Sequence, residues 1–145
     1  MDAPCPPAAV RVWVDDLDRY PRWLTIVTRA EPLGDVDGRP AWSVDLTGRL
    51  GPLARSKRLR MVRTRHDDTT TVFERVEADG RHHAPWVLTA QVTATAAGSH
   101  LTMRLHYGGA LWGPVLERVL RDEIEGATAR LLGLVGAQDD EAQAP

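Results

Sequence analysis

Three residues in the second half of the sequence are of types that can transfer protons, and they lie among apolar neighbours. Glu123 falls within the apolar stripe of a predicted helix, and a lone buried carboxylate must be paired, hydrated or protonated. His106 and Tyr107 end a predicted strand. A histidine acts as an acid or base near neutral pH, and a tyrosine hydroxyl can orient an otherwise apolar ligand. Glu123, Tyr107 and His106 are therefore the candidates for catalysis, and the sequence identifies no complete catalytic set.

Glu123 has two interpretations, which the sequence leaves open. It is either a residue at the helix edge that an arginine from the sheet satisfies, or a polar group that points into a ligand cavity. Strand alternation groups Phe73 with Arg75 and Glu77. If Phe73 points inward, Arg75 could pair with Glu123. If Val72 and its alternates mark the inner face instead, these charges face solvent.

Other catalytic and metal-binding patterns are absent from the sequence. His82-His83 are adjacent, and neighbours on an extended chain point apart, so the pair is poorly placed to hold one metal ion. The sequence contains no phosphate-binding glycine loop, no GxSxG motif and no Cys–His nucleophile pattern. It therefore predicts no metal site and no cofactor.

Composition is that of an ordinary globular protein. The 145 residues are 43% hydrophobic and 26% charged, with a net charge of −2. We expect one domain over residues 1–135 and a disordered tail over residues 136–145. The single cysteine, Cys5, excludes an internal disulfide and fits a reducing cytoplasm. The sequence shows no signal peptide and no transmembrane segment, so we expect a cytoplasmic protein.

The longest helical pattern, from Trp112 to Val135, begins with Gly113-Pro114 and presents one apolar stripe. Near the N-terminus the apolar spacing predicts a short helix from about Ala8 to Leu17, followed by a second helical turn, RYPRWL. Between these helices, alternating residues and turn signals, among them GDVDG and the hairpin signal Asp79-Gly80, predict strands. There are six: Thr25 to Glu31, Ala41 to Leu50, Ser56 to His66, Thr69 to Ala78, Pro85 to Ala96 and His100 to Tyr107.

Strands in sequence order with short turns predict an antiparallel meander, and only the C-terminal helix is long enough to cover its apolar face. The residues that we expect between sheet and helix, as lining or core, are Trp42, Phe73, Arg75, Trp86, Leu88, Met103, Leu105, Tyr107, Leu116, Leu120, Glu123 and Ala127.

The third predicted strand is strongly basic: Arg55, Lys57, Arg58, Arg60, Arg63 and Arg65. One interpretation is a solvated outer face that pairs with Glu74 and the acidic turn Asp67-Asp68. The other is a surface that binds RNA, lipid headgroups or a protein partner. The negative net charge and the lack of interleaved aromatic residues argue against nucleic acid.

Three groups of residues carry a resemblance to a known family. They are Val12-Trp13 with Asp16-Leu17, the segment Tyr20-Pro21-Arg22-Trp23, and Gly108-Gly109 before the final helix. Over residues 3–135 the chain resembles the START-type helix-grip superfamily (SRPBCC), and within it the bacterial polyketide cyclase/dehydrase and lipid-transport group.

The resemblance implies an α+β helix-grip fold, in which a curved antiparallel sheet of about six strands wraps around the C-terminal helix. Helix-grip proteins usually begin with a long strand, of which only Met1 to Pro4 remain here. Either the start is assigned late or the sheet has an exposed edge, which would favour dimerisation, so we expect a monomer or a homodimer.

The resemblance also implies a mostly apolar cavity that binds a lipid, polyketide or quinone-like molecule, with or without cyclase or dehydrase activity. The alternatives are a non-enzymatic carrier and an interaction protein that uses the basic strand 55–65.

Overall fold

The computed structural model describes the backbone of residues 1–50, 53–108 and 113–144, and the side chains of residues 1–48, 56–108 and 126–144. Within these residues the chain forms seven strands, two α-helices and a 3₁₀ helix, η1. In chain order these are β1 Asp2–Ala3, α1 Pro7–Val14, η1 Leu17–Arg22, β2 Val27–Val36, β3 Arg39–Leu50, β4 Leu53–His66, β5 Thr70–Arg75, β6 Trp86–Thr95, β7 Gly98–Tyr107 and α2 Gly113–Gln143.

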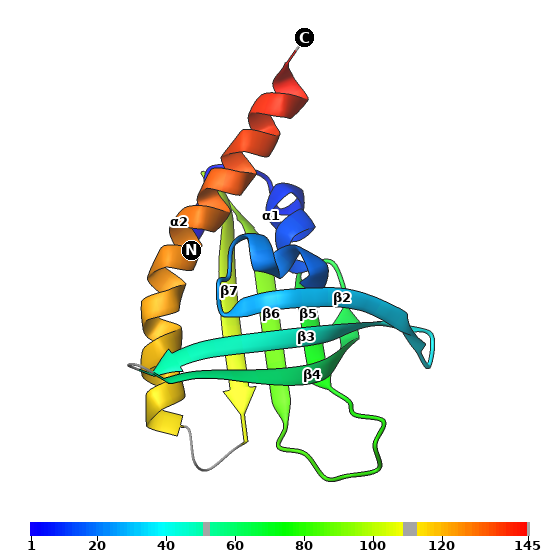
Figure 1. The fold of residues 1–145 in the computed structure, drawn as a ribbon. Helices are drawn as coiled ribbons and strands as arrows, with labels where there is room; N and C mark the ends of the chain where they lie inside the picture. Colours follow the sequence, from blue (N-terminus) through cyan, green and yellow to red (C-terminus); the bar gives the residue numbers. More distant parts are fainter. Residues whose placement is uncertain (51–52, 109–112, 145) are drawn as a thin grey trace.

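The strands form one antiparallel sheet in the order β1-β7-β6-β5-β4-β3-β2. The sheet is strongly curved, so that β2, β3 and β4 cross in front of β5, β6 and β7 in Figure 1. Helix α2 runs along the side of the sheet where β7 lies, and its C-terminal part extends beyond the strands. The predicted combination of a curved antiparallel sheet, a long C-terminal helix and short N-terminal helices is confirmed.

The two-residue strand β1 adds to the six predicted strands. Asp2 pairs with His100 and Ala3 pairs with Ser99. The Met1 amine and carbonyl extend this ladder by hydrogen bonds with the carbonyl and N–H of Leu101, each 2.8 Å long. The first residues of the chain are therefore part of the sheet.

Strand β2 is longer than predicted, because it continues through Pro32 and Gly34 to Val36. A proline lacks the N–H that a central strand needs, but β2 is an edge strand, where that position can face solvent. The hairpin turn lies at Asp37-Gly38, the last two residues of the predicted turn segment GDVDG, and these have φ angles of 51° and 75°. Positive φ at both central residues is typical of the type I′ turn that suits two-residue hairpins.

Two other boundaries differ from the prediction. Strand β5 ends at Arg75, so Asp79-Gly80 is a turn within a longer connection over residues 76–85 rather than a tight hairpin. Helix α2 continues to Gln143, where the sequence led us to expect a disordered tail. The indole N–H of Trp13 donates to Gln138 Oε1 at 3.1 Å, which ties this extension to α1.

Side chains from η1 and the concave face of the sheet pack into an aromatic cluster. Tyr20 and Phe73 are fully buried. The Phe73 ring makes T-shaped contacts with the rings of Tyr20 and Trp42, with centroid distances of 6.2 and 5.5 Å. Trp23 packs beside Tyr20 at 4.7 Å. This cluster fixes η1 against one end of the sheet.

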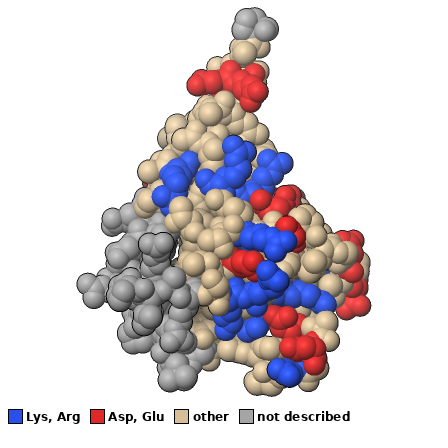
Figure 2. Space-filling model, viewed as in Figure 1, with Lys and Arg blue, Asp and Glu red and all other residues tan. Residues whose placement is uncertain are grey.

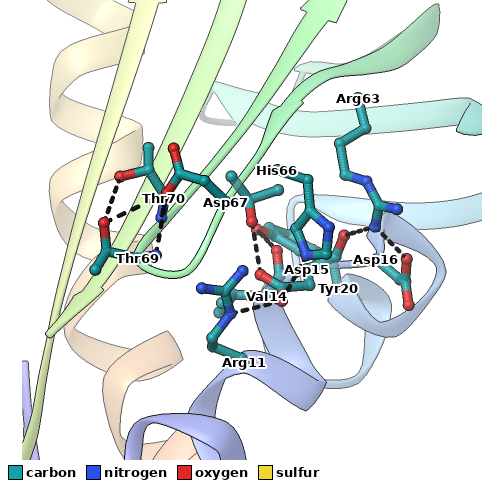
Figure 3. Close-up of polar contacts among 11 residues, drawn as sticks. Arg11, Val14, Asp15, Asp16, Tyr20, Arg63, His66, Asp67, Thr69 and Thr70 are labelled. Atoms are coloured by element: carbon teal, nitrogen blue, oxygen red, sulfur yellow. Dashed lines mark hydrogen bonds and ion pairs between the residues drawn. The ribbon is translucent and has the colours of Figure 1, made fainter. Parts of the chain in front are cut away.

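Asp15, at the end of α1, links the helical segment to the β4–β5 hairpin (Figure 3). Its carboxylate accepts hydrogen bonds from the Thr71 hydroxyl at 2.7 Å, from Arg11 Nε at 2.8 Å and from His66 Nε2 at 3.1 Å. Burial alone would raise the pKa of Asp15, but these hydrogen bonds outweigh it and hold the pKa below the ordinary value of 3.8. The charged form of Asp15 therefore stabilises the fold.

Replacing Gly98 by alanine should destabilise the protein by about 2–4 kcal/mol. Gly98 has φ of 145°, and a Cβ there would lie 2.2 Å from the Ala3 carbonyl oxygen and 2.7 Å from the Cys5 nitrogen. The measurement is urea unfolding of Gly98→Ala beside Gly34→Ala, a strand position where a Cβ meets nothing within 4 Å. Equal stability of the two variants would contradict the close contact between β7 and residues 3–5.

The Asp15→Asn variant should lose about 1–3 kcal/mol at pH 7. Because the folded-state pKa is lowered, the contribution of Asp15 is complete above the unfolded value of 3.8 and disappears as pH falls through the folded-state pKa. The stability difference from wild type should therefore shrink between pH 5 and pH 2 in denaturant titrations. Asp68→Asn, at an exposed carboxylate of the same hairpin, is the control, and a difference independent of pH would refute this role.

Candidate ligand-binding cavity

A cavity of about 440 Å³ lies between the concave face of the sheet, η1 and α2. Strand alternation supplies most of its wall, because residues two apart on one strand share a face. The pairs are Val44 and Leu46 on β3, Leu59 and Met61 on β4, Trp86 and Leu88 on β6, and Met103 and Leu105 on β7.

Helix α2 contributes Ala127 and Leu131 to the wall, which are one turn apart and both buried. Ala127 has only a methyl group, so it leaves space where a larger residue would fill the cavity. At the η1 end the wall includes Leu17, Tyr20, Trp23, Leu24, Ile26 and Val27.

Tyr20 brings a polar atom to this end, but the atom is already satisfied. Its hydroxyl donates to the Val14 carbonyl at 2.9 Å. Burial first, and then the negative charges of Asp15 and Asp16, raise the pKa of Tyr20 far above its ordinary value. The phenol therefore stays neutral and serves to fix η1.

Besides the Tyr20 phenol, the ionisable groups among the described lining residues lie at the β1–β7 edge. They are His100, Arg104 and the Met1 amine, which donates to the Leu101 carbonyl. His100 Nδ1 lies 2.6 Å from Asp2 Oδ1, and both His100 and Arg104 are partly or fully exposed to solvent. These groups mark a rim of the cavity, whereas its interior is apolar.

Five of the residues predicted between sheet and helix line the cavity: Trp86, Leu88, Met103, Leu105 and Ala127. Trp42 and Phe73 belong instead to the aromatic cluster behind the wall, where the Trp42 indole N–H donates to Asp18 Oδ1 at 2.9 Å. The predicted side chains of Leu116, Leu120 and Glu123 lie outside the described residues.

Arg75 shares the inner face with fully buried Phe73, so the inward alternative for this strand holds. Its side chain is 8% exposed and donates from Nε to Glu77 Oε1 at 2.9 Å. Glu77 also accepts the Arg60 backbone N–H at 3.1 Å. Burial opposes the charge of Glu77, but these two donors hold its pKa below the usual range. Among the described residues, Glu77 is thus the carboxylate that neutralises Arg75.

Tyr107 and His106 point to different sides of the sheet. Tyr107 is opposite Trp86 in the β6–β7 ladder, and their ring centroids are 4.6 Å apart at the inner face. His106 is exposed and is not among the described residues that line the cavity. Of the two, only Tyr107 lies beside a wall residue.

The basic strand does not present a uniform basic surface. Arg58 makes two hydrogen bonds with Asp45, of 2.7 and 3.0 Å, and Arg65 pairs with Asp67 at 2.6 Å. Arg63 donates to Asp16 Oδ1 at 3.0 Å. Figure 2 shows basic and acidic residues side by side on the visible face. For Arg58 and Arg65 the interpretation as an outer face paired with acidic residues is supported. Arg63 instead lies on the inner face, opposite Phe73 in the β4–β5 ladder, with its guanidinium 6.0 Å from the centroid of the Trp42 ring.

Lys57, like Arg63, lies on the inner face of β4 and so differs from Arg58 and Arg65. It is opposite Leu46, a wall residue, in the β3–β4 ladder. Its ammonium lies 5.7 Å from the ring centroids of both Trp86 and Tyr107. The sequence grouped Lys57 with the outer arginines, and the signal that separates it is its alternation with Leu59 and Met61.

The η1 residues of the wall were not predicted as lining. The spacing of Tyr20, Trp23 and Leu24 showed an apolar side of a helical turn, but it could not show which part of the sheet that side covers.

In the described part of the chain there is no group of three or more His, Cys, Asp or Glu residues that could hold a metal ion. Likewise, no helix in that part is long and apolar enough to cross a membrane.

Comparison with protein families gives a match over residues 1–135 to the family described as polyketide cyclase / dehydrase and lipid transport. The chain belongs to this family. Its resemblance to the START-type helix-grip superfamily is thereby confirmed, and family and fold together fit a protein with a hydrophobic ligand-binding cavity. Among curated proteins, no sequence gave a significant match.

Solved structures share the fold at low sequence identity. A START superfamily protein from Mycobacterium smegmatis has a TM-score of 0.69 and 16% identity, with coverage of 95% of this chain and 94% of its own. A Thermus thermophilus protein has a TM-score of 0.64 and 17% identity, with coverage of 98% and 94%.

The di-domain ARO/CYC StfQ of the steffimycin biosynthetic pathway has a TM-score of 0.69 and 14% identity. The match covers 97% of this chain but only 50% of StfQ, so the chain spans about half of that protein. At these identities the likeness establishes the fold.

Proposed function

We propose that this protein binds an apolar small molecule, such as a lipid, a polyketide or a quinone-like compound, in the cavity between the sheet and α2. The observation that carries the proposal is the cavity itself, whose 440 Å³ falls within the range of about 300–1,000 Å³ for small-molecule sites. Its interior is lined by aliphatic and aromatic side chains from β3, β4, β6, β7, η1 and α2.

The binding energy of such a ligand would come from removing apolar surface from water, at about 25 cal/mol per Å². The Tyr20 hydroxyl and the Arg75 guanidinium, two polar groups near the interior, are already engaged by Val14 and Glu77. Shape and apolar area would therefore dominate selection over most of the cavity.

Cyclase or dehydrase activity on a polyketide-like substrate is the second candidate, and the description of the family supports it. In such a reaction the cavity would fold the substrate chain, and one or two polar groups would move protons. Tyr107, beside the wall residue Trp86, is a candidate for that task. Glu123 is a further candidate from the sequence.

An interaction protein that uses the basic strand has less support. Arg58, Arg63 and Arg65 are each paired with an aspartate of the same chain. A polyanion would have to compete with these intramolecular partners. Ligand binding in the cavity needs no such competition.

The Ala127→Trp variant should bind apolar ligands at least about tenfold more weakly than wild type, because an indole at this wall position would occupy the cavity. The measurement is titration with the neutral fluorophore aminoanthracene, together with native mass spectrometry of molecules that co-purify with each protein. The same spectra distinguish a monomer from a homodimer.

The matched control for this experiment is Ala129→Trp, which adds the same side chain at an exposed position two residues further along α2. It should bind the fluorophore like wild type. Equal weakening in both variants, or no binding by wild-type protein of any apolar ligand tested, would refute the proposed function.

The Tyr107→Phe variant separates the two candidate functions. For an enzyme, loss of the hydroxyl should lower turnover of a polyketide-type substrate by about 10²-fold or more while the dissociation constant changes little. For a carrier, binding and release should both remain near wild type. Product formation by liquid chromatography and ligand titration are measured on the same preparations, and unchanged turnover would remove Tyr107 from the catalytic candidates.

A further inference from the structure

Trp86, a residue of the cavity wall, carries a polar atom that the described residues leave without a partner. The side chain is 7% exposed and lines the cavity. Its indole Nε1 is buried and has no hydrogen-bond partner among the described residues. A buried donor without a partner costs about 1–3 kcal/mol. A ligand oxygen that accepts this hydrogen bond would remove that cost.

Lys57 places a positive charge beside the same indole. Its ammonium lies 5.7 Å from the centroids of the Trp86 and Tyr107 rings. No carboxylate of the described residues forms an ion pair with it. Lys57 is exposed at the surface. Desolvation, and then the nearby Arg75 cation, lower the pKa of Lys57, whereas the charge of Glu77 acts in the opposite direction. An anion at this position would meet an electropositive environment.

The charges around this corner indicate how much negative charge it would hold. Arg75 and Glu77 neutralise each other through their 2.9 Å contact. Lys57 forms no ion pair among the described residues, because Glu77 attracts it only from beyond ion-pair distance and is held by Arg75 and Arg60. It lies beside one N–H donor that has no partner in that part of the chain. One ammonium and one N–H match the two oxygens of a carboxylate, whereas a phosphate monoester brings more charge than one cation neutralises.

We propose that the Lys57–Trp86 corner is the headgroup site for an amphipathic monocarboxylate, whose carboxylate contacts Lys57 and the Trp86 N–H while its apolar body fills the cavity. This inference rests on the proposed function and adds the ligand class and its orientation. The body would extend from the corner toward Ala127 and Tyr20, along the apolar wall.

The experiment compares laurate, methyl laurate, lauryl alcohol and lauryl phosphate as ligands by calorimetric titration at pH 7. Wild-type protein should bind laurate about three- to tenfold more tightly than methyl laurate. Lauryl phosphate should bind more weakly than laurate. Laurate affinity equal to or below that of the ester and the alcohol would overturn the inference, and so would tighter binding of the phosphate.

Substitutions test which residues cause the preference for laurate over methyl laurate. Lys57→Met should abolish the preference for laurate without weakening methyl laurate, while Lys57→Arg should retain it. Arg58→Met, which removes the same charge from the outer face of the same strand, should behave like wild type. Trp86→Phe should weaken laurate and methyl laurate alike by about threefold, because both offer an oxygen to the indole N–H. A preference that survives in Lys57→Met would overturn the assignment.

The outcomes separate the two proposals. If laurate, methyl laurate and lauryl alcohol bind wild-type protein equally, and Ala127→Trp weakens all three, the headgroup site is refuted and the cavity function stands. If none of the ligands binds wild-type protein, both proposals fail. Thermal unfolding of each variant without ligand confirms that the binding data come from folded protein.

Discussion

The packing of η1 against the sheet is the constraint on which the cavity depends. A six-residue 3₁₀ helix has too few internal hydrogen bonds to be stable alone. Here Tyr20 fills the aromatic cluster, Trp42 donates to Asp18, and Arg130 of α2 donates to the Trp23 carbonyl at 2.9 Å. These contacts fix η1 to the sheet and to α2 together, and so close one end of the space between them.

The space stays open because the sheet is strongly curved and a single helix covers it. Side chains from β3 and β4 face those from β6 and β7, and Ala127 adds only a methyl group between them. An unfilled apolar cavity loses dispersion contacts and costs stability, at about 24 cal/mol per Å³ in engineered cores. A bound apolar molecule restores those contacts, so ligand binding and folding stability are linked in this protein.

Much of this fold could be predicted from the sequence, because the strands alternate clearly and short turns separate them. The errors have physical causes. Proline has a low propensity for strands, so the sequence predicted that the strand ends before Pro32. The strand continues through Pro32 because β2 lies at the edge of the sheet, where a residue without an N–H is tolerated. The sequence left the facing of Arg75 open. Its described partner is Glu77, which lies beyond the end of β5, where the course of the chain could not be predicted. Lys57 and Trp86 approach each other from β4 and β6, the two strands that flank β5 in the sheet. This is a non-local contact that no spacing in the sequence contains.

The two ends of the inner face differ in whether their polar groups already have partners within the protein. At the η1 end, Asp15 is charged but accepts hydrogen bonds from Thr71, Arg11 and His66, and the Tyr20 hydroxyl is held by Val14. Proton transfer by these groups would break contacts that maintain the fold. At the other end, Lys57 has no carboxylate partner among the described residues, and the Trp86 N–H is unused in that part of the chain. Recognition of a polar group, and any chemistry that accompanies it, is therefore least costly to the fold at the Lys57–Trp86 corner.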